Sequence, residues 1–126
     1  MIDPWNELEH TRPQGLSETE HISQVLGKIR RFAHAHGVHI WLVAHPTKLA
    51  KDREGGYPVP TPYDVSGSAH FRNKADMALS VWRDVTNEDA PTQMHIQKVR
   101  FRESGQIGMV SLYFDKVTGR YSDTEP

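Results

Sequence analysis

A capped helix followed at once by a β-rich run is the feature that most restricts the fold of this chain. Ser17 and Glu20 have the spacing of a capping box, in which each side chain satisfies a backbone group of the first helical turn. Apolar residues then recur at helical spacing: Ile22, Val25, Leu26, Ile29 and Phe32. Gly37 suits a left-handed helix end. Residues 38–44, VHIWLVA, follow directly and are typical of a strand covered on both faces.

The segments around this helix extend the pattern into an α/β fold. Residues 1–4 have the character of a strand end, so strand, helix and strand make a βαβ unit with parallel strands. Residues 77–82 predict another buried strand. Residues 93–101 and 107–115 alternate in polarity around a glycine-containing turn, which predicts an antiparallel hairpin, and residues 120–121 add a short last strand. We expect parallel strands with flanking helices, ending in an antiparallel hairpin.

Composition excludes several classes of protein. The 15 Lys and Arg residues nearly balance the 16 Asp and Glu residues, so any nucleic-acid contact must come from a local patch. The chain has no cysteine, which excludes disulfides and cysteine-ligated metals. The longest apolar run, residues 38–44, is too short to cross a bilayer, and nothing resembles a secretory signal. We therefore expect no membrane partner and a cytoplasmic location.

A long polar loop occupies residues 46–65. Loops of this length in compact domains are usually functional, and this one carries three cations, Lys48, Lys51 and Arg53. Three cations on one loop can meet phosphates, although a solvated surface loop is the alternative. We expect Ser66 to cap a short helix behind the loop.

Two polar residues follow strands of the predicted βαβ unit. His45 comes directly after residues 38–44, and Asp3 ends the strand before the helix. Ligands of open α/β sheets bind at the carboxyl ends of the strands, and an aspartate there can hold magnesium through its waters. The alternatives are a histidine hydrogen-bonded to a loop and an aspartate that forms a turn.

Two cations, Lys98 and Arg100, share one face of a predicted strand because strand side chains alternate. Together they can reach a phosphate across a subunit boundary. Two solvent-facing charges on an antiparallel sheet are the alternative.

Two further patterns are absent or weak. His34 and His36 point in different directions on the helix, and no HExxH spacing occurs, so a histidine-based metal hydrolase ranks last. There is also no G-x-x-x-x-G-K-[ST]. The Gly27-Lys28 pair lies inside the helix, so this chain cannot cradle a triphosphate by itself.

The segments "WLVAHPTK", "SGSAHFRNKAD", "KVRF" and "LYFDKVTGRY" occur in this order along the chain. In order and spacing they resemble the C-terminal half of the ring-shaped replicative helicase motor. The similar proteins are DnaB, the Twinkle helicases and the phage primase–helicases, most closely the toprim-containing phage and bacterial members. The resemblance spans nearly the whole chain and implies a partial RecA-like P-loop NTPase core that lacks the P-loop strand. It also implies a bacterial or phage origin.

Carried over by position, the resemblance implies a nucleotide-sensing role for several residues. Asp3 matches the Walker B aspartate, which organises magnesium on ATP. His45 matches the histidine that senses the terminal phosphate. The motif that links nucleotide state to the DNA loop includes Arg72 and Asn73, where the phage relatives have glutamine in place of Asn73.

The resemblance also implies contacts with DNA, with the neighbouring subunit and with the base. The loop carrying Lys48, Lys51 and Arg53 matches the DNA-binding loop of the ring's channel. Lys98-Val99-Arg100 matches the family's K-x-R, whose arginine acts on the neighbouring subunit's phosphate. The residues at the positions that sandwich the base are Arg83 and Phe114, the latter replacing a tyrosine.

We therefore expect residues 1–126 to be the C-terminal part of a helicase ATPase domain, a fragment of a longer or split coding region. In the full-length protein, ATP with magnesium, single-stranded DNA and the other subunits of a hexameric ring are the implied partners. The isolated chain is expected to self-associate through unpaired strand edges and not to hydrolyse ATP. A standalone, ATPase-inactive module that binds single strands or regulates a helicase is the alternative. A recombinase or packaging ATPase fragment is a further one.

Overall fold

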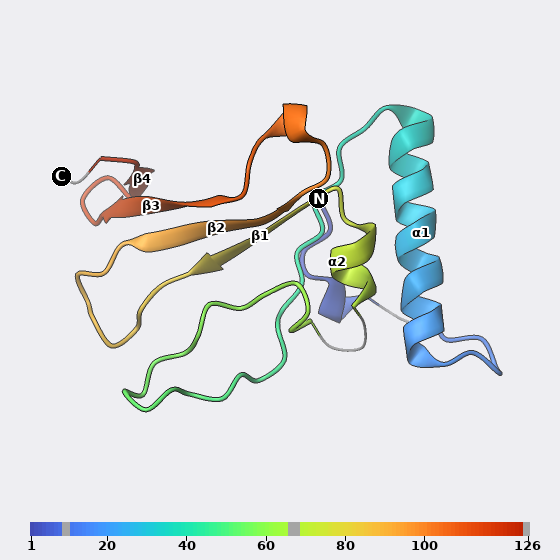
Figure 1. Ribbon diagram of the computed structural model, residues 1–126, viewed down its shortest axis with the longest axis horizontal. Coiled ribbons are helices and arrows are strands. Elements are labelled where there is room, and N and C mark those ends of the chain that lie inside the picture. The colour runs from blue at the N-terminus through green and yellow to red at the C-terminus, as the bar shows by residue number, and fades with distance from the viewer. Residues whose placement is uncertain (9–10, 66–68, 125–126) are drawn as a thin grey trace. The chain divides into compact units, whose positions relative to one another are not determined.

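The computed structural model describes residues 1–8, 11–65 and 69–124 of the 126-residue chain. It divides into two compact units, each described by itself. The first unit comprises residues 1–47 and 63–75 and holds both α-helices. The second comprises residues 48–62 together with the chain from residue 76 onward, and it holds the four-stranded sheet (Figure 1).

The long helix α1 (Glu18–His36) begins and ends where the sequence predicts. The Ser17 hydroxyl accepts a hydrogen bond from the Glu20 amide at 3.2 Å, and the Glu20 carboxylate accepts from the Ser17 amide at 2.9 Å. The hydrogen bond from the Ser17 hydroxyl, with that from its amide, lowers the pKa of Glu20. At the other end Gly37 adopts a φ of 60°, a left-handed conformation that few residues besides glycine tolerate. The capping box and the glycine end are both confirmed.

The core of the first unit joins α1 to two short segments. Its buried side chains are Trp5, Ile22, Leu26 and Phe71. Trp5 lies in the 3₁₀ helix η1 (Trp5–Glu7) and Phe71 in helix α2 (His70–Lys74), and their rings meet edge to face with centroids 5.4 Å apart. Because α2 has only five residues, this packing rather than helix propensity holds it in place. The expected cap, Ser66, lies outside the described residues.

The predicted strand over residues 38–44 is reduced to a single parallel bridge between Ile2 and Leu42. The Ile2 amide donates to the Trp41 carbonyl at 2.8 Å, and the Val43 amide donates to the Ile2 carbonyl at 2.9 Å. A longer ladder needs a longer partner, and the chain turns into η1 three residues after Ile2. The expected cover on both faces is also wrong, because Trp41 is 55% exposed while Leu42 packs against the core.

The second unit is an antiparallel sheet in the order β1-β2-β3-β4. Its strands are β1 (Met77–Trp82), β2 (Thr92–Val99), β3 (Gly108–Asp115) and β4 (Arg120–Ser122). The predicted hairpin and last strand are confirmed. The expected parallel sheet is wrong, because β1 pairs antiparallel with β2. Short connections favour this outcome, since they close neighbouring strands at little entropic cost. The predicted burial of β1 is wrong too, as Val81 is 60% exposed.

The proline-rich part of the loop is tied to this sheet. The Pro60 carbonyl accepts hydrogen bonds from Ser80 Oγ at 2.7 Å and from Gln97 Nε2 at 2.9 Å. The Trp82 indole donates to the Tyr57 carbonyl at 2.8 Å. Backbone carbonyls of an irregular segment thus find donors on β1 and β2, which explains how a stretch with alternate prolines keeps an ordered path.

Two glycine substitutions test the helix. Gly27→Ala should raise the free energy of unfolding by about 0.5–1 kcal/mol, because glycine inside a helix is destabilising. An added Cβ would lie 3.4 Å from Arg31 Nη1 and 3.7 Å from Lys74 Nζ, both ends of flexible side chains. Gly37→Ala should lower it by about 1–2 kcal/mol, because Gly37 is left-handed. Urea unfolding followed by far-UV circular dichroism would measure both, and equal signs would contradict the assigned helix end.

Candidate functional site

Asp3 and His45 lie at the same end of two paired segments. Ile2 bridges Leu42 in parallel, so the chain runs in the same direction through residues 2–6 and 41–45. The pairing continues past the bridge, where the His45 amide donates to the Asn6 side-chain oxygen at 2.8 Å. Both Asp3 and His45 are exposed. The backbone thus places a carboxylate and an imidazole on one rim of the first unit, where each can meet a ligand.

The motif residues of α2 also belong to the first unit. Arg72 is half-buried, and its guanidinium lies 5.2 Å from the centre of the Tyr63 ring, within cation–π range. Asn73 is exposed, and its backbone N–H donates to the Ala69 carbonyl at 3.1 Å. Phe71 anchors the helix in the core between Trp5 and α1. The core therefore fixes where the two polar residues that follow Phe71 are presented.

The cationic loop of the second unit contains a tight turn organised by Asp52. The Asp52 carboxylate accepts from the amides of Glu54 at 3.0 Å and Gly56 at 2.9 Å, and the Asp52 amide donates to the Gly56 carbonyl at 2.9 Å. All three predicted loop cations are exposed: Lys48, Lys51 and Arg53. Lys51 Nζ lies 5.1 Å from the centre of the Tyr57 ring. Lys51 and Arg53 directly flank Asp52, whose carboxylate is already hydrogen-bonded to backbone amides of the turn.

Arg100 is held by Asp76, the acid directly before β1. Its Nε lies 3.1 Å from Asp76 Oδ1, with the side chains 27% and 37% exposed, and its amide donates to the Asp76 carbonyl at 2.8 Å. Asp76 Oδ1 is itself buried, and the contact meets the distance of an ion pair without the angles of a hydrogen bond. A phosphate that binds Arg100 must therefore compete with Asp76.

A β-bulge lies beside this pair. Ala78 pairs with Lys98 and Leu79 pairs with Ile96, which leaves Gln97 as an extra residue on β2. Its amide bonds the Pro60 carbonyl, and its side-chain oxygen accepts from Ser80 Oγ at 3.1 Å. Bulges re-aim the side chains that follow them and occur often beside active sites. Lys98 and Arg100 both follow this bulge, Lys98 within β2 and Arg100 one residue beyond its end.

Arg83 and Phe114 each have a different partner in the structure. The Arg83 guanidinium donates to the carbonyls of Ala90, at 3.1 Å, and of Glu88, so it closes the turn between β1 and β2. The Phe114 ring lies 5.0 Å from the Tyr121 ring on β4. These hydrogen bonds lie in the plane of the guanidinium and use its edge, whereas a stacked base would approach its face.

Three contributors to these arrangements were not anticipated from the sequence: Asn6, Asp76 and Gln97. Asp76 had a partial signal in the sequence, because it directly precedes β1, but the β1–β2 register that places it opposite Arg100 comes from the structure. The bulge at Gln97 had none, since a uniform alternation predicts a regular ladder. Within residues 1–8, 11–65 and 69–124 no three His, Asp or Glu side chains gather as metal ligands, and no helix is long and apolar enough to cross a bilayer.

A comparison with known proteins found a relative of this chain. Over an alignment of 127 positions covering 98% of this chain, it is 46% identical to the Twinkle homolog protein, chloroplastic/mitochondrial, of Arabidopsis thaliana. This chain is related to the Twinkle/DnaB-like helicase family. It spans 18% of the length of that Twinkle homolog. No protein-family model matches it.

This relationship confirms the resemblance to the Twinkle and DnaB group and corrects the expected origin. A cytoplasmic protein of bacterial or phage type was expected, and that expectation is wrong, because the Twinkle relative is a chloroplastic/mitochondrial plant protein.

The Asp76–Arg100 pair can be tested directly. Asp76→Asn should lower the free energy of unfolding by about 1 kcal/mol or less, because half-exposed ion pairs are screened by water. The loss should shrink in high salt. Asp123→Asn, an exposed acid near the C-terminus, is the charge-matched control and should change little. Urea unfolding at two salt concentrations would measure both, and a loss independent of salt would argue against an ion pair.

Proposed function

We propose that residues 1–126 form the C-terminal part of a RecA-like ATPase domain in a DNA helicase. In this proposal the first unit senses the nucleotide, and the loop of the second unit grips single-stranded DNA. The relationship to the Twinkle homolog supports the helicase assignment. The observation that carries the nucleotide role is the parallel pairing of Ile2 with Leu42, because it sets Asp3 and His45 on one rim.

The roles of the first unit follow from charge and reach. Asp3 is the residue that would hold magnesium on ATP. As a single exposed carboxylate it fits a contact through the ion's waters and does not supply a coordination shell. The imidazole of His45 can donate a hydrogen bond to a terminal phosphate. Arg72 and Asn73, held by the Phe71 anchor, would pass the change to the loop. Magnesium, when bound, would neutralise charge on the phosphate oxygens.

The roles of the second unit require a neighbouring subunit. Phosphoryl transfer depends mainly on charge placed around the phosphate oxygens, so an arginine delivered from the next subunit can control the rate. Lys98 and Arg100 are proposed for this contact in a hexameric ring. In the isolated chain Arg100 is paired with Asp76, which holds the arginine side chain in place. In this proposal the arginine exchanges Asp76 for a phosphate when one arrives. Arg83 and Phe114 are proposed to hold the base.

The cationic loop is proposed to contact the backbone of a DNA strand. Lys48, Lys51 and Arg53 are exposed, and contacts to phosphates alone suit a motor that moves along any sequence. Its movement with phosphate release would turn hydrolysis into a step along the strand. The ties between Pro60 and the sheet give the loop a fixed base from which to move.

DNA binding tests this proposal. Replacing Lys48, Lys51 and Arg53 together by alanine should weaken binding of a deoxythymidine oligonucleotide. The slope of log K against log salt should fall in magnitude by about 2, since each lost phosphate contact removes about 0.7 on a single strand. Fluorescence anisotropy over a salt series would measure it.

The matched control removes the same charge elsewhere in the second unit. Arg102, Lys116 and Arg120 are exposed and lie outside the loop. Their triple alanine variant should keep the slope of the unmodified chain. Equal losses in the two variants would mean general charge attraction and would count against a DNA-binding loop.

A second candidate is a standalone, ATPase-inactive module that binds single strands or regulates a helicase. The exposed cations Lys48, Lys51 and Arg53 also suit such a module, because contact with the phosphates of a single strand needs no nucleotide. Sequencing the DNA upstream of residue 1 separates the two, because an in-frame P-loop supports the helicase and an independent start supports the module.

A further inference from the structure

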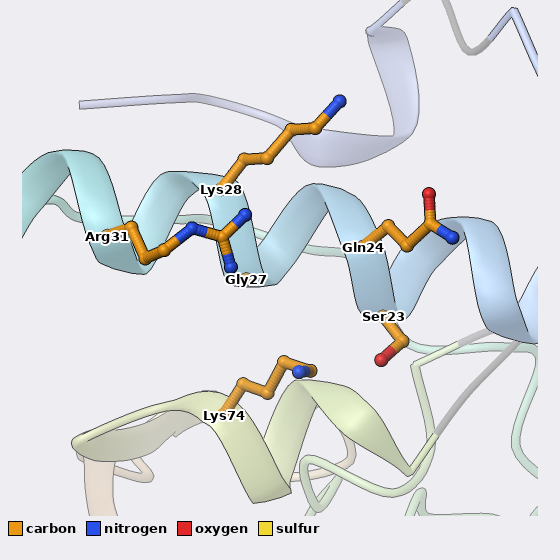
Figure 2. Close-up of a pocket in the computed structure, with 6 residues that line it drawn as sticks. All are labelled: Ser23, Gln24, Gly27, Lys28, Arg31 and Lys74. Carbon is orange, nitrogen blue, oxygen red and sulfur yellow. The ribbon is translucent and has the colours of Figure 1, made fainter.

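A cationic hollow lies between α1 and α2 in the first unit, away from the residues assigned above. It measures about 320 Å³ and is lined by Ser23, Gln24, Gly27, Lys28, Arg31 and Lys74. Figure 2 shows Ser23 and Lys74 pointing into the space below Gly27, and Arg31 reaching along α1 towards it. Lys28 and Gln24 extend away from Lys74 in that view and lie at the rim.

The hollow exists because Gly27 has no side chain. Ser23, Gly27 and Arg31 are four residues apart, so they follow one ridge of α1. A Cβ at Gly27 would lie 3.4 Å from Arg31 Nη1 and 3.7 Å from Lys74 Nζ. Two cations from different helices therefore flank one point above bare helix backbone, and a hydroxyl stands one turn away.

The acids of α1, Glu18 and Glu20, lie in its first turn, and neither lines the hollow. From His21 to the end of α1, and throughout α2, the sequence contains no Asp or Glu. Among the described residues no carboxylate lies in the lining. Like charges that flank one point repel each other. A bound anion would offset that repulsion.

We propose that this Gly27 hollow is a binding site for a phosphate group. A guanidinium and an ammonium at one point, with a hydroxyl one helical turn away, suit an oxyanion with several acceptor oxygens. The lining has no apolar or aromatic side chain. The site can therefore recognise charge, but it has no surface on which a base could stack. The phosphate can come from a free anion or from the backbone of a nucleic-acid strand.

The decisive variant is Gly27→Glu, compared with Gly27→Ala. A glutamate at this position lies four residues before Arg31, the favourable order for a helical ion pair, and its carboxylate would fill the hollow. Both replacements favour the helix over glycine, so a loss of binding in the glutamate variant cannot be ascribed to a failure to fold. Arg31→Gln combined with Lys74→Gln removes both charges and leaves a polar side chain at each position.

The experiment is an NMR titration of the full 126-residue chain with sodium pyrophosphate and, separately, with a deoxythymidine oligonucleotide. Sodium chloride of equal ionic strength is the blank. We expect saturable shifts of the Ser23, Gly27 and Lys74 amides, kept in Gly27→Ala, and at least tenfold weaker binding in Gly27→Glu and in the double glutamine variant. Shifts with pyrophosphate identify a free anion as sufficient, and shifts with the oligonucleotide alone identify a strand.

Two outcomes would overturn the proposal: no saturable shift at these amides with either probe, or equal affinity in Gly27→Glu and Gly27→Ala. The loop variant at Lys48, Lys51 and Arg53 should keep its pyrophosphate shifts at the hollow. A failure of the DNA-binding loop and a failure of the Gly27 hollow can therefore be told apart.

Discussion

The edge-to-face packing of Trp5 on Phe71, against Ile22 and Leu26 of α1, is the contact on which the first unit depends. The N-terminal segment, the long helix and the five-residue helix α2 each contribute to this small core. In the N-terminal segment and in α2, polar residues lie close in sequence to the buried one. Asp3 precedes Trp5 by two positions, and Arg72 and Asn73 follow Phe71. Four buried side chains thus determine where the proposed nucleotide-sensing groups are presented.

The second unit is organised by hydrogen bonds at its surface rather than by buried apolar side chains. The Pro60 and Tyr57 carbonyls use donors on β1 and β2, and the bulge at Gln97 supplies one of them. The same bulge precedes Lys98 and Arg100. The base of the cationic loop and the strand that leads to the proposed arginine finger therefore share a residue. A change in one has a physical route to the other within this unit.

The two proposals use positive charge in different ways. The loop offers exposed cations around a turn whose own acid is occupied by backbone amides, which suits weak contacts along a strand. The Gly27 hollow brings two cations of different helices to one point, which suits a single phosphate. Arg100 differs from both, because it is already paired with Asp76 through Nε, and a phosphate would have to share or replace that partner.

The sequence by itself determined what depends on neighbours along the chain. The capping box at Ser17 and Glu20, the left-handed end at Gly37, the bounds of β1 and the hairpin of β2 and β3 are local patterns with strong spacing rules, and all are present. The local pattern wrongly predicted a strand over residues 38–44. A β-rich run forms a strand only beside a partner of similar length, and here Ile2 provides a single bridge. The local pattern also left open the partners of Arg100 and Arg83 and the hollow at Gly27. Only the tertiary structure decided these, because strand register and the approach of two helices bring together residues that no spacing along the chain relates.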